Sequence, residues 1–349
     1  MSDFITLTPS GAWLIMPPKI RRWIVFGLPW PLLLLSMLMG PSGVFSLQDV
    51  LESAKAGVLG TPMPEKAPLV RAILWDIRVP RVLLAFLVGG ALASSGATLQ
   101  AIFRNPLVSP YVLGVSSGAA FGTAIALASS LFPAYPAAFF FSLTAVGCSY
   151  VLGRVGKTVS PVSLVLSGII VSGFFTALLT LVQFLTDPFK LQSIVHWTMG
   201  NMHNADWHRL KGSLPFLGLG YAGMFALRWR MNVLALGDQE SWAVGIHPER
   251  EKIRMIVPAT LAASAAVAAA GVVGMVGLVV PHMVRMILGP DNRLGIPACM
   301  VFGGAFLVLM DNLARSLTAF ELPIGIFTTL VGGPFFIFLL RRTQLGWHA

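Results

Sequence analysis

The stretch from residue 82 to residue 103 reads VLLAFLVGGALASSGATLQAIF and holds no charge between Arg81 and Arg104. A bilayer core about 30 Å thick needs roughly 20 apolar residues per helix, so this stretch predicts a membrane-spanning helix. The composition of the whole chain agrees. Of its 349 residues, 56% are hydrophobic and 11% are charged. A soluble domain carries about 25% charged residues, so the surplus apolar surface is expected to face lipid.

Other apolar stretches repeat this pattern along the chain. Those close to the length of a span are 23–40, 112–132, 134–153, 161–186, 213–229, 253–273, 294–317 and 322–340. One further piece, 274–289, is shorter and interrupted by Pro281. Together these stretches predict an all-α polytopic membrane protein with about ten transmembrane helices. No part reads as a separate soluble domain, so residues 1–349 are expected to form a single transmembrane domain.

The basic residues predict how the chain lies in the membrane. If the N-terminus is inside and the spans alternate, 15 of the 24 Lys and Arg residues fall on the inner side. Such a bias is typical of cytoplasmic loops, so both termini are expected in the cytoplasm. The net charge of +10 is therefore explained by membrane orientation, and no nucleic-acid partner is expected.

The polar segment 234–254 reads LALGDQESWAVGIHPEREKIR and separates two of the apolar stretches. Asp238 and Glu240 suit the first turn of a helix, where the helix dipole favours acids. Gly245 suits the left-handed position that ends such a helix, and Pro248 suits the first turn of the next one. The segment therefore predicts two short helices, too polar to span, that lie along the inner membrane face.

Three apolar side chains stand among the charges of this segment: Leu236, Trp242 and Ile246. An ordinary solvated loop has no need of apolar side chains at these positions.

One carboxylate lies deep within an apolar run. Acids inside the membrane are candidates for a functional site, and Asp311 is the one this chain offers. Arg315 follows four residues later, which is the spacing of an ion pair on a helix. We therefore expect Asp311 to form a structural pair near the outer end of its span and not to carry protons.

The sequence RVPR, residues 78–81, begins and ends with an arginine and lies at the outer end of a predicted span. Taken alone, Arg78 and Arg81 are interpreted as anchors whose apolar stems lie along the membrane while the charges reach water. The other interpretation is a docking patch for an acidic partner.

The segment after the charge-free stretch contains turn and packing signals. Asn105 and Pro106 belong to RNPLVSPYVLG, where the prolines predict a turn on the inner side and the Asn side chain can bond freed backbone groups. Gly114, Gly118 and Gly122 recur every four residues, so they are expected to line one helix face and allow a close helix neighbour.

The sequence offers little for catalysis or for a cofactor. Gly156-Lys157-Thr158 resembles the end of a phosphate-binding loop, but Val151 occupies the position that requires glycine. The outer-segment residues His196, His203 and His208 match no standard zinc spacing. We expect no catalytic residue, no resident metal and no cofactor in this chain.

Four stretches together resemble the permease subunits of ABC importers for vitamin B12, haem and ferric siderophores, the FecCD type. They are RVPRVLLAFLVGGALASSGATLQAIFRNPLVSPYVLGVSSGAAFG, LALGDQESWAVGI, GMVGLVVPHMVRMILGPDNR and DNLARSLTAFELPIGIFTTLVGGPFFIFLLRR. The resemblance implies a BtuC-like fold with ten helices in the bacterial inner membrane. It also implies a homodimer with a pore on the two-fold axis, two cytoplasmic ATPase subunits and a periplasmic binding protein.

The resemblance also assigns expected roles to individual residues. Segment 234–254 corresponds to the coupling helices, and the residues expected to dock on the ATPase are Leu236, Gly237, Asp238, Trp242, Gly245, Ile246 and His247. The residues expected to meet acidic groups of the binding protein are Arg78, Arg81 and Arg315. Those expected in the helix-packing and translocation region are Asn105, Pro106, Gly114, Gly118 and Gly122.

The resemblance implies inward transport of a metal chelate, with ATP hydrolysed by a separate subunit. A ferric siderophore ranks first as cargo, then haem, which the outer His and Met residues favour slightly, then cobalamin. Pro161 and Val162 depart from the small hydroxyl residues usual near the family's gate, so the gate is not assigned. The alternative is an ion-coupled secondary transporter, for which a midplane carboxylate or an ion site at a broken helix would be required.

Overall fold

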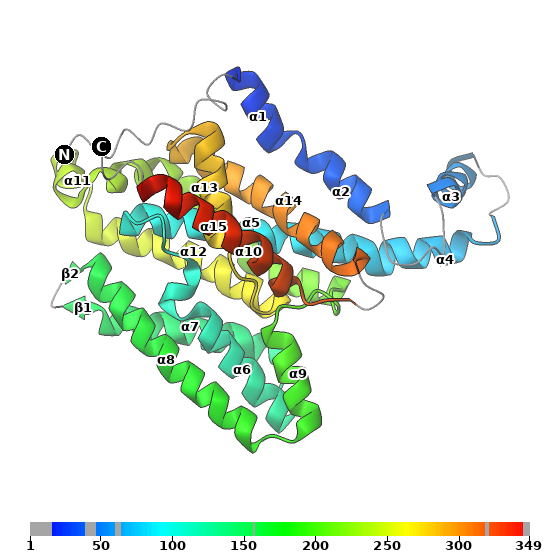
Figure 1. Ribbon diagram of the computed structural model, residues 1–349, viewed down its shortest axis with the longest axis horizontal. Helices are drawn as coiled ribbons and strands as arrows, with labels where there is room; N and C mark the ends of the chain where they lie inside the picture. Colours follow the sequence, from blue (N-terminus) through cyan, green and yellow to red (C-terminus); the bar gives the residue numbers. More distant parts are fainter. Residues whose placement is uncertain (1–15, 39–46, 60–63, 156–157, 318–320, 345–349) are drawn as a thin grey trace.

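The computed structural model describes residues 16–38, 47–59, 64–155, 158–317 and 321–344. Almost all of this chain is helical (Figure 1). The first half contains α1 (Pro18–Phe26), α2 (Pro29–Leu38), α3 (Leu47–Leu59), α4 (Ala67–Arg71), the π-helical turn η1 (Ala72–Arg78), α5 (Val79–Phe103), the 3₁₀ turn η2 (Pro110–Leu113), α6 (Val115–Ser129) and α7 (Ala134–Leu152). The second half contains α8 (Pro161–Leu185), α9 (Pro188–Thr198), α10 (Trp207–Leu236), α11 (Asp238–Ala243), α12 (Pro248–Ala270), α13 (Val276–Leu288), α14 (Asn292–Ser316) and α15 (Ile324–Gln344).

A short antiparallel hairpin joins α7 to α8. Its strands are β1 (Arg154–Val155) and β2 (Thr158–Val159), with Arg154 opposite Val159. Gly156 and Lys157, which belong to the sequence that resembles a phosphate-binding loop, lie outside the described residues.

The predicted spans correspond to helices of the structure. Within the described residues, six helical segments are long and apolar enough to cross a membrane, and α6, α13 and the apolar part of α15 are shorter. Helix α10 accounts for the predicted span 213–229 but is longer, because it extends through charged residues at both ends. The expectation of an all-α polytopic protein with about ten spans is confirmed.

The first predicted span is interrupted. It is split into α1 and α2, with Gly27 and Leu28 between them. Pro29 explains the break, because proline has no backbone N–H and disfavours helical geometry at the residue before it.

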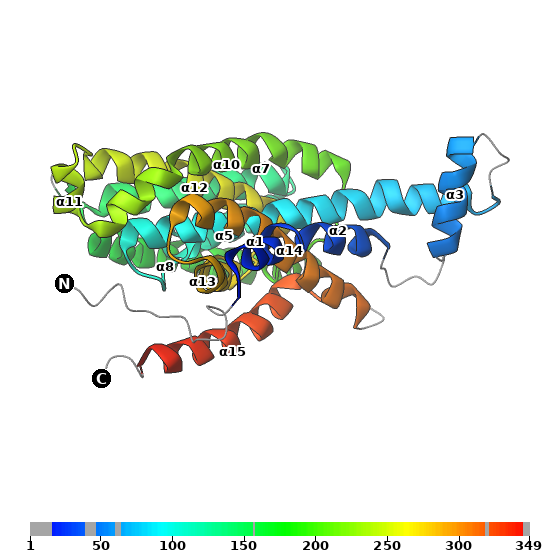
Figure 2. The same cartoon turned by 90° about the horizontal axis from the view of Figure 1, so that it is seen from above.

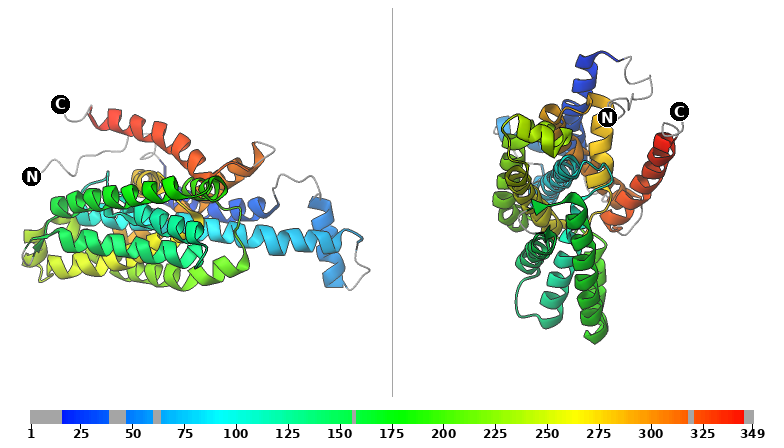
Figure 3. Two further views of the ribbon diagram at one scale, coloured as in Figure 1. Left: turned by 90° about the horizontal axis from the view of Figure 1, so that it is seen from below. Right: turned by 90° about the vertical axis from the view of Figure 1, so that its left-hand side faces the viewer.

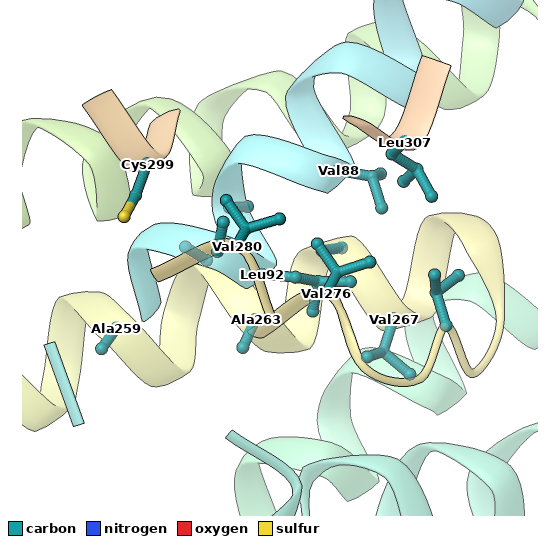
Figure 4. Close-up of a cluster of buried hydrophobic side chains, with 14 of the residues drawn as sticks. Val88, Leu92, Ala259, Ala263, Val267, Val276, Val280, Cys299 and Leu307 are labelled. Carbon is teal, nitrogen blue, oxygen red and sulfur yellow. The ribbon is translucent and has the colours of Figure 1, made fainter. Parts of the chain in front are cut away.

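Helix α5 lies at the centre of the bundle. Of its 25 residues, 20 are buried, and it packs against α10, α12, α13 and α14. Figure 4 shows part of this core, where Val88 and Leu92 of α5 meet Val276 of α13 and Leu307 of α14. A helix that is apolar on all sides is expected to be covered on all sides. The charge-free stretch 82–103 is therefore the core helix of the part of the chain that the structure describes.

Small residues let the neighbours of α5 approach very closely. A Cβ atom added to Gly96 would lie 2.0 Å from the carbonyl oxygen of Gly277 in α13. One added to Gly89 would lie 2.3 Å from the carbonyl oxygen of Gly303 in α14. Close backbone contact of this kind is a main source of helix association in lipid.

Helices α6 to α9 form a second packing unit, which projects from the rest of the bundle in the right-hand view of Figure 3. Its own small core includes Val171 and Phe175 of α8, packed against Phe121 and Phe141. Only 22% of the most apolar stretch of α8 is buried. Its exposed apolar side chains include Val162, Leu166, Ile170, Phe174 and Leu181. This face of α8 requires lipid or another protein chain to cover it.

The two ends of the bundle differ. Figure 2 shows α11 at one end of the long axis and α3 at the other, with α5 running between them. We refer to these as the α11 end and the α3 end. The charged residues gather at both ends, and they form the two candidate sites described next.

Candidate functional site

Helix α11 forms a short spur at the α11 end of the bundle. It begins directly after Gly237 and is followed by Gly245, whose φ of +77° is the left-handed geometry that the sequence predicted. Nothing lies within 4 Å of a Cβ atom added to Gly245, so only backbone geometry calls for glycine there. Asp238 and Glu240 occupy the first turn, as expected.

The second predicted helix is not a separate short helix. Pro248 is the first residue of α12, as predicted, but α12 continues without a break to Ala270 and includes the apolar span. The charges in its first turns do not stop it, because they are neutralised by ion pairs. Glu251 lies 2.6 Å from Arg230 and 2.7 Å from Arg254. The prediction of two short helices was therefore wrong for the second one.

Apolar side chains are exposed on this spur. Leu236 is 70% exposed, Trp242 56% and Val244 64%. Ile246 is half-buried, and the ring of His247 lies edge-on to Trp242 with centroids 4.3 Å apart. Sequence reasoning did not include Val244 among the exposed apolar residues. The signal for it was its position, two residues after Trp242 and directly before Gly245. Exposed apolar surface of this kind is typical of a site that contacts another protein or a membrane, and docking on an ATPase stays a prediction.

Asp238 lies in this segment but its carboxylate turns toward the bundle. Its Oδ1 lies 3.0 Å from Nη2 of Arg104, the residue that ends α5. Its Oδ2 lies 2.8 Å from Nζ of Lys252 in α12. Lys252 also lies 3.0 Å from Glu249. Sequence reasoning did not single out Arg104 or Lys252, because nothing local relates them to a carboxylate so far away in the chain.

The turn after α5 has the predicted form. The side-chain oxygen of Asn105 accepts a hydrogen bond from the backbone N–H of Leu107 at 2.9 Å, and Pro106 lies between them in an exposed turn. Asn105 thus bonds a backbone N–H of the turn itself.

The glycine series packs against α7. Cβ atoms added to Gly118 and Gly122 would each lie 2.4 Å from carbonyl oxygens of α7. Gly114 differs from the expectation, because it is not inside the helix: with φ of +87° it is the residue before α6. The reason is that η2 ends there, and the left-handed residue turns the chain into α6.

Two irregular segments meet inside the bundle near these glycines. The Tyr111 hydroxyl donates to the carbonyl oxygen of Val273 at 2.5 Å and accepts from the N–H of the same residue at 3.2 Å. Gln100 donates to the carbonyl oxygen of Gly277 at 3.2 Å and accepts from Arg285 at 2.6 Å. Backbone that leaves helical geometry at membrane depth needs such partners, because lipid offers none.

At the α3 end, a buried cluster surrounds Asp311. Arg81 lies 2.9 Å from Asp311 and 2.8 Å from Glu321, so it joins α5 to α14 and to the segment before α15. Arg315 lies 3.4 Å from Asp311, and this confirms the predicted pair. A cavity of about 130 Å³ beside the cluster is also lined by His203.

The three arginines of the predicted docking patch are not at the surface. Arg78, Arg81 and Arg315 are 4%, 7% and 3% exposed. Arg78 donates to the backbone carbonyl of Leu38 at 2.8 Å, and Arg315 donates to Ser36 at 3.0 Å. The resemblance implies an exposed patch, but these arginines are buried because carboxylates and carbonyl groups of the same chain surround them. Their contact with a binding protein stays a prediction.

Glu321 is a member of this cluster that sequence reasoning missed. Burial disfavours its charged form, but hydrogen bonds from His203 and Arg81 and the charge of Arg81 outweigh burial and lower the pKa of Glu321. Glu321 lies 240 positions from Arg81. The signal in the sequence was a single acid between two apolar spans.

Three further polar residues around the junction of α9 and α10 have partners in the described part of the chain. The Nδ1 atom of His203 lies 2.9 Å from Glu321, and that of His196 lies 2.8 Å from the amide of Asn201. Asp206 accepts from the backbone N–H of Arg209 at 2.7 Å and so caps α10.

A comparison with solved structures finds one of the same architecture. A chain described as the inward-facing conformation of a metal-chelate type ABC transporter matches with a TM-score of 0.79 and 32% identity, covering 93% of this chain and 100% of that one. At this identity and coverage the likeness extends to the whole bundle.

Curated relatives match over most of the chain as well. An iron chelatin transport system permease protein of Helicobacter pylori is 38% identical, covering 80% of this chain and 86% of its own length. The cobalamin import system permease protein BtuC of Halobacterium salinarum is 37% identical, covering 97% and 86%. The molybdate import system permease protein MolB of Haemophilus influenzae is 35% identical, covering 95% and 99%. A family model matches residues 26–342. The chain belongs to the FecCD transport family.

Proposed function

We propose that this chain, as the permease subunit of an ABC importer, moves a metal chelate from the periplasm to the cytoplasm across a bacterial inner membrane. Its partners in this proposal are a second copy of itself, two cytoplasmic ATPase subunits and a periplasmic binding protein. Residues 1–349 act as one transmembrane domain with both termini in the cytoplasm. Family membership supports the permease role, and the bias of basic residues toward the α11 end supports the orientation.

The observation that carries the ATPase contact is the exposed apolar surface of α11. Trp242 of α11 and its flanking residues Leu236 and Val244 are exposed at the end for which the bias of basic residues favours the cytoplasm. A folded helix with a fixed position and unpaired apolar side chains provides a rigid contact for a partner cleft. The mechanism is alternating access: ATP-bound and nucleotide-free ATPase dimers each favour one state of the pore through different contacts with α11.

We propose the cargo by its chemical class, a metal chelate. A ferric siderophore ranks first, then haem, then cobalamin, in keeping with relatives named for an iron chelate and for cobalamin. The relative named for molybdate shows that an oxyanion is the competitor to test.

Reconstitution with the cognate ATPase and binding protein tests the function. We expect uptake of a ferric siderophore into vesicles only when ATP and both partner proteins are present. Haem, cobalamin and molybdate, offered in turn, test the ranking of the cargo. Uptake driven by a proton or sodium gradient without the ATPase would support the secondary transporter and contradict the proposal.

Replacing Trp242 with alanine should weaken ATPase binding about 30-fold, because an aromatic anchor truncated at an interface often costs about 2 kcal/mol. Trp242 is 56% exposed, and within the described residues its one aromatic neighbour is the ring of His247. The affinity is measured by titrating purified ATPase onto the permease in detergent. Trp229→Ala is the matched control, since Trp229 is 48% exposed on α10 and not on α11. Equal affinity for the two variants would remove α11 from the ATPase interface.

A further inference from the structure

One carboxylate joins three elements at the α11 end. Asp238 is the first residue of α11, and its two oxygens are engaged by different cations. Oδ1 lies 3.0 Å from Nη2 of Arg104 at the end of α5, and Oδ2 lies 2.8 Å from Nζ of Lys252 in α12. Two contacts from one short side chain therefore connect α11 to α5 and α12, while the buried Ser241 connects it to α10 by a hydrogen bond to the carbonyl oxygen of Val233 at 3.2 Å.

The two contacts differ in their surroundings. The side chain of Lys252 is only 6% exposed, while those of Asp238 and Arg104 are 39% and 36% exposed. A buried ammonium group depends on its carboxylate partners, because removing one leaves charge in a poorly hydrated place. The Arg104 contact is more solvated and is worth less by itself. Asp238 is thus held mainly by Lys252 and directed by Arg104.

The backbone of Arg104 supports a positioning role. Its φ of 51° and ψ of 35° are left-handed, which is uncommon for a residue other than glycine. This geometry ends α5, and the N–H of Arg104 still bonds the carbonyl oxygen of Gln100. The side chain of Gln100 in turn bonds Gly277 and Arg285 of α13. The last turn of α5 therefore contacts α11 through one residue and α13 through another.

Lys252 provides a second connection. It lines a narrow crevice together with Phe103 of α5 and Pro161 and Leu164 of α8. The beginning of α8, whose long face is open to lipid or to another chain, thus lies beside the lysine that holds Asp238.

We infer that Asp238 is a positioning residue that fixes α11 to α5 and α12, so that a displacement of α11 is transmitted to both helices. The inference rests on the proposed function, in which α11 docks on the ATPase. It assigns to Asp238 a contact with its own chain in place of the ATPase contact that the family resemblance implies. Trp242 and Leu236 bind the partner, and Asp238 passes on the movement.

The test is coupling in the reconstituted full complex. Asp238→Asn should leave ATPase binding and ATP hydrolysis in place but lower uptake per ATP about tenfold, the size expected when one contact of a coupled pair is lost. Arg104→Gln should act in the same direction. The double variant should be no worse than Asp238→Asn alone, because both changes remove one shared contact. Glu240→Gln, which removes a carboxylate from the same turn, is the control and should keep normal uptake per ATP.

A distance measurement separates positioning from a loss of stability. Spin labels on Ala243 in α11 and Leu107 after α5, both exposed, should report one narrow distance that does not change with nucleotide. In Asp238→Asn the distance distribution should broaden. Normal uptake per ATP, an unchanged distance, additive effects of the two variants, or loss of ATPase binding in Asp238→Asn would each overturn the inference. A failure of the proposed ATPase contact gives a different result, because Trp242→Ala would then bind the ATPase with full affinity.

Discussion

Replacing Gly96 with valine is expected to destabilise the folded bundle strongly and to lower the yield of assembled protein. A Cβ atom at this position would lie 2.0 Å from the carbonyl oxygen, 2.7 Å from the carbonyl carbon and 2.8 Å from the Cα atom of Gly277. These are backbone atoms, so no rotamer change relieves the overlap. Helices α5 and α13 must separate, and the hydrogen bond from Gln100 to Gly277 at 3.2 Å is lost with the contact.

The expected cost is large for one substitution. Overpacking a tight core costs about 1–3 kcal/mol, and the lost hydrogen bond adds about 0.5–1.5 kcal/mol. The readout is the yield of monodisperse protein in mild detergent, followed by thermal unfolding of what remains. Gly147→Val is the control, because nothing lies within 4 Å of a Cβ atom added to Gly147 in α7. Equal yield and equal unfolding temperature for both variants would show that α5 and α13 do not need this close contact.

Replacing Asp311 with asparagine is expected to cost about 3–5 kcal/mol of stability, because it removes one partner from a buried ion cluster. Asp311 is 1% exposed and lies between Arg81 at 2.9 Å and Arg315 at 3.4 Å. Arg81 keeps Glu321, whereas Arg315 is left with neutral partners such as Ser36. The change in the free energy of unfolding is measured by denaturant titration in detergent.

The same variant distinguishes the two kinds of transporter. In complexes that do assemble, uptake should remain driven by ATP and indifferent to a proton gradient. Asp76→Asn is the control, because Asp76 is an exposed carboxylate on η1, next to the start of α5, and should change stability by no more than about 0.5 kcal/mol. A proton-gradient dependence that disappears in Asp311→Asn would mean that this carboxylate carries protons, and the ABC importer mechanism would then be wrong.

Local rules predicted much of the fold and the local shape of the α11 segment. The charge-free run of α5, the prolines, and Gly245 after α11 act within a few residues of themselves, so their effect can be found in the sequence. Charge spacing also predicted the pair of Asp311 and Arg315, which share one helix. What local rules missed are the partners that tertiary packing selects. Arg104 and Asp238 are 134 positions apart, and Arg81 and Glu321 are 240 apart.

The same limit explains the errors. The second helix of the polar segment was expected to be short because its charges were counted as exposed, and two of them, Glu251 and Lys252, are buried in ion pairs. The RVPR arginines were expected at the surface because the sequence does not show that Asp311, Glu321 and the carbonyl group of Leu38 surround them.

The central position of α5 has a consequence for how the chain is made. Its neighbours α12, α13 and α14 follow far behind it in the sequence, and α14 ends at Ser316 while α5 ends at Phe103. At about 5–20 residues per second, synthesis takes roughly 10–40 s to supply them. During that time the buried Ser95 has no carbonyl oxygen of Ala259 in α12 to bond, and the buried Gln100 has neither Gly277 nor Arg285 of α13. Nascent α5 therefore has to stay in contact with the insertion machinery until α12, α13 and α14 have been synthesised. We expect depletion of the insertase to reduce the yield of folded protein most during this interval.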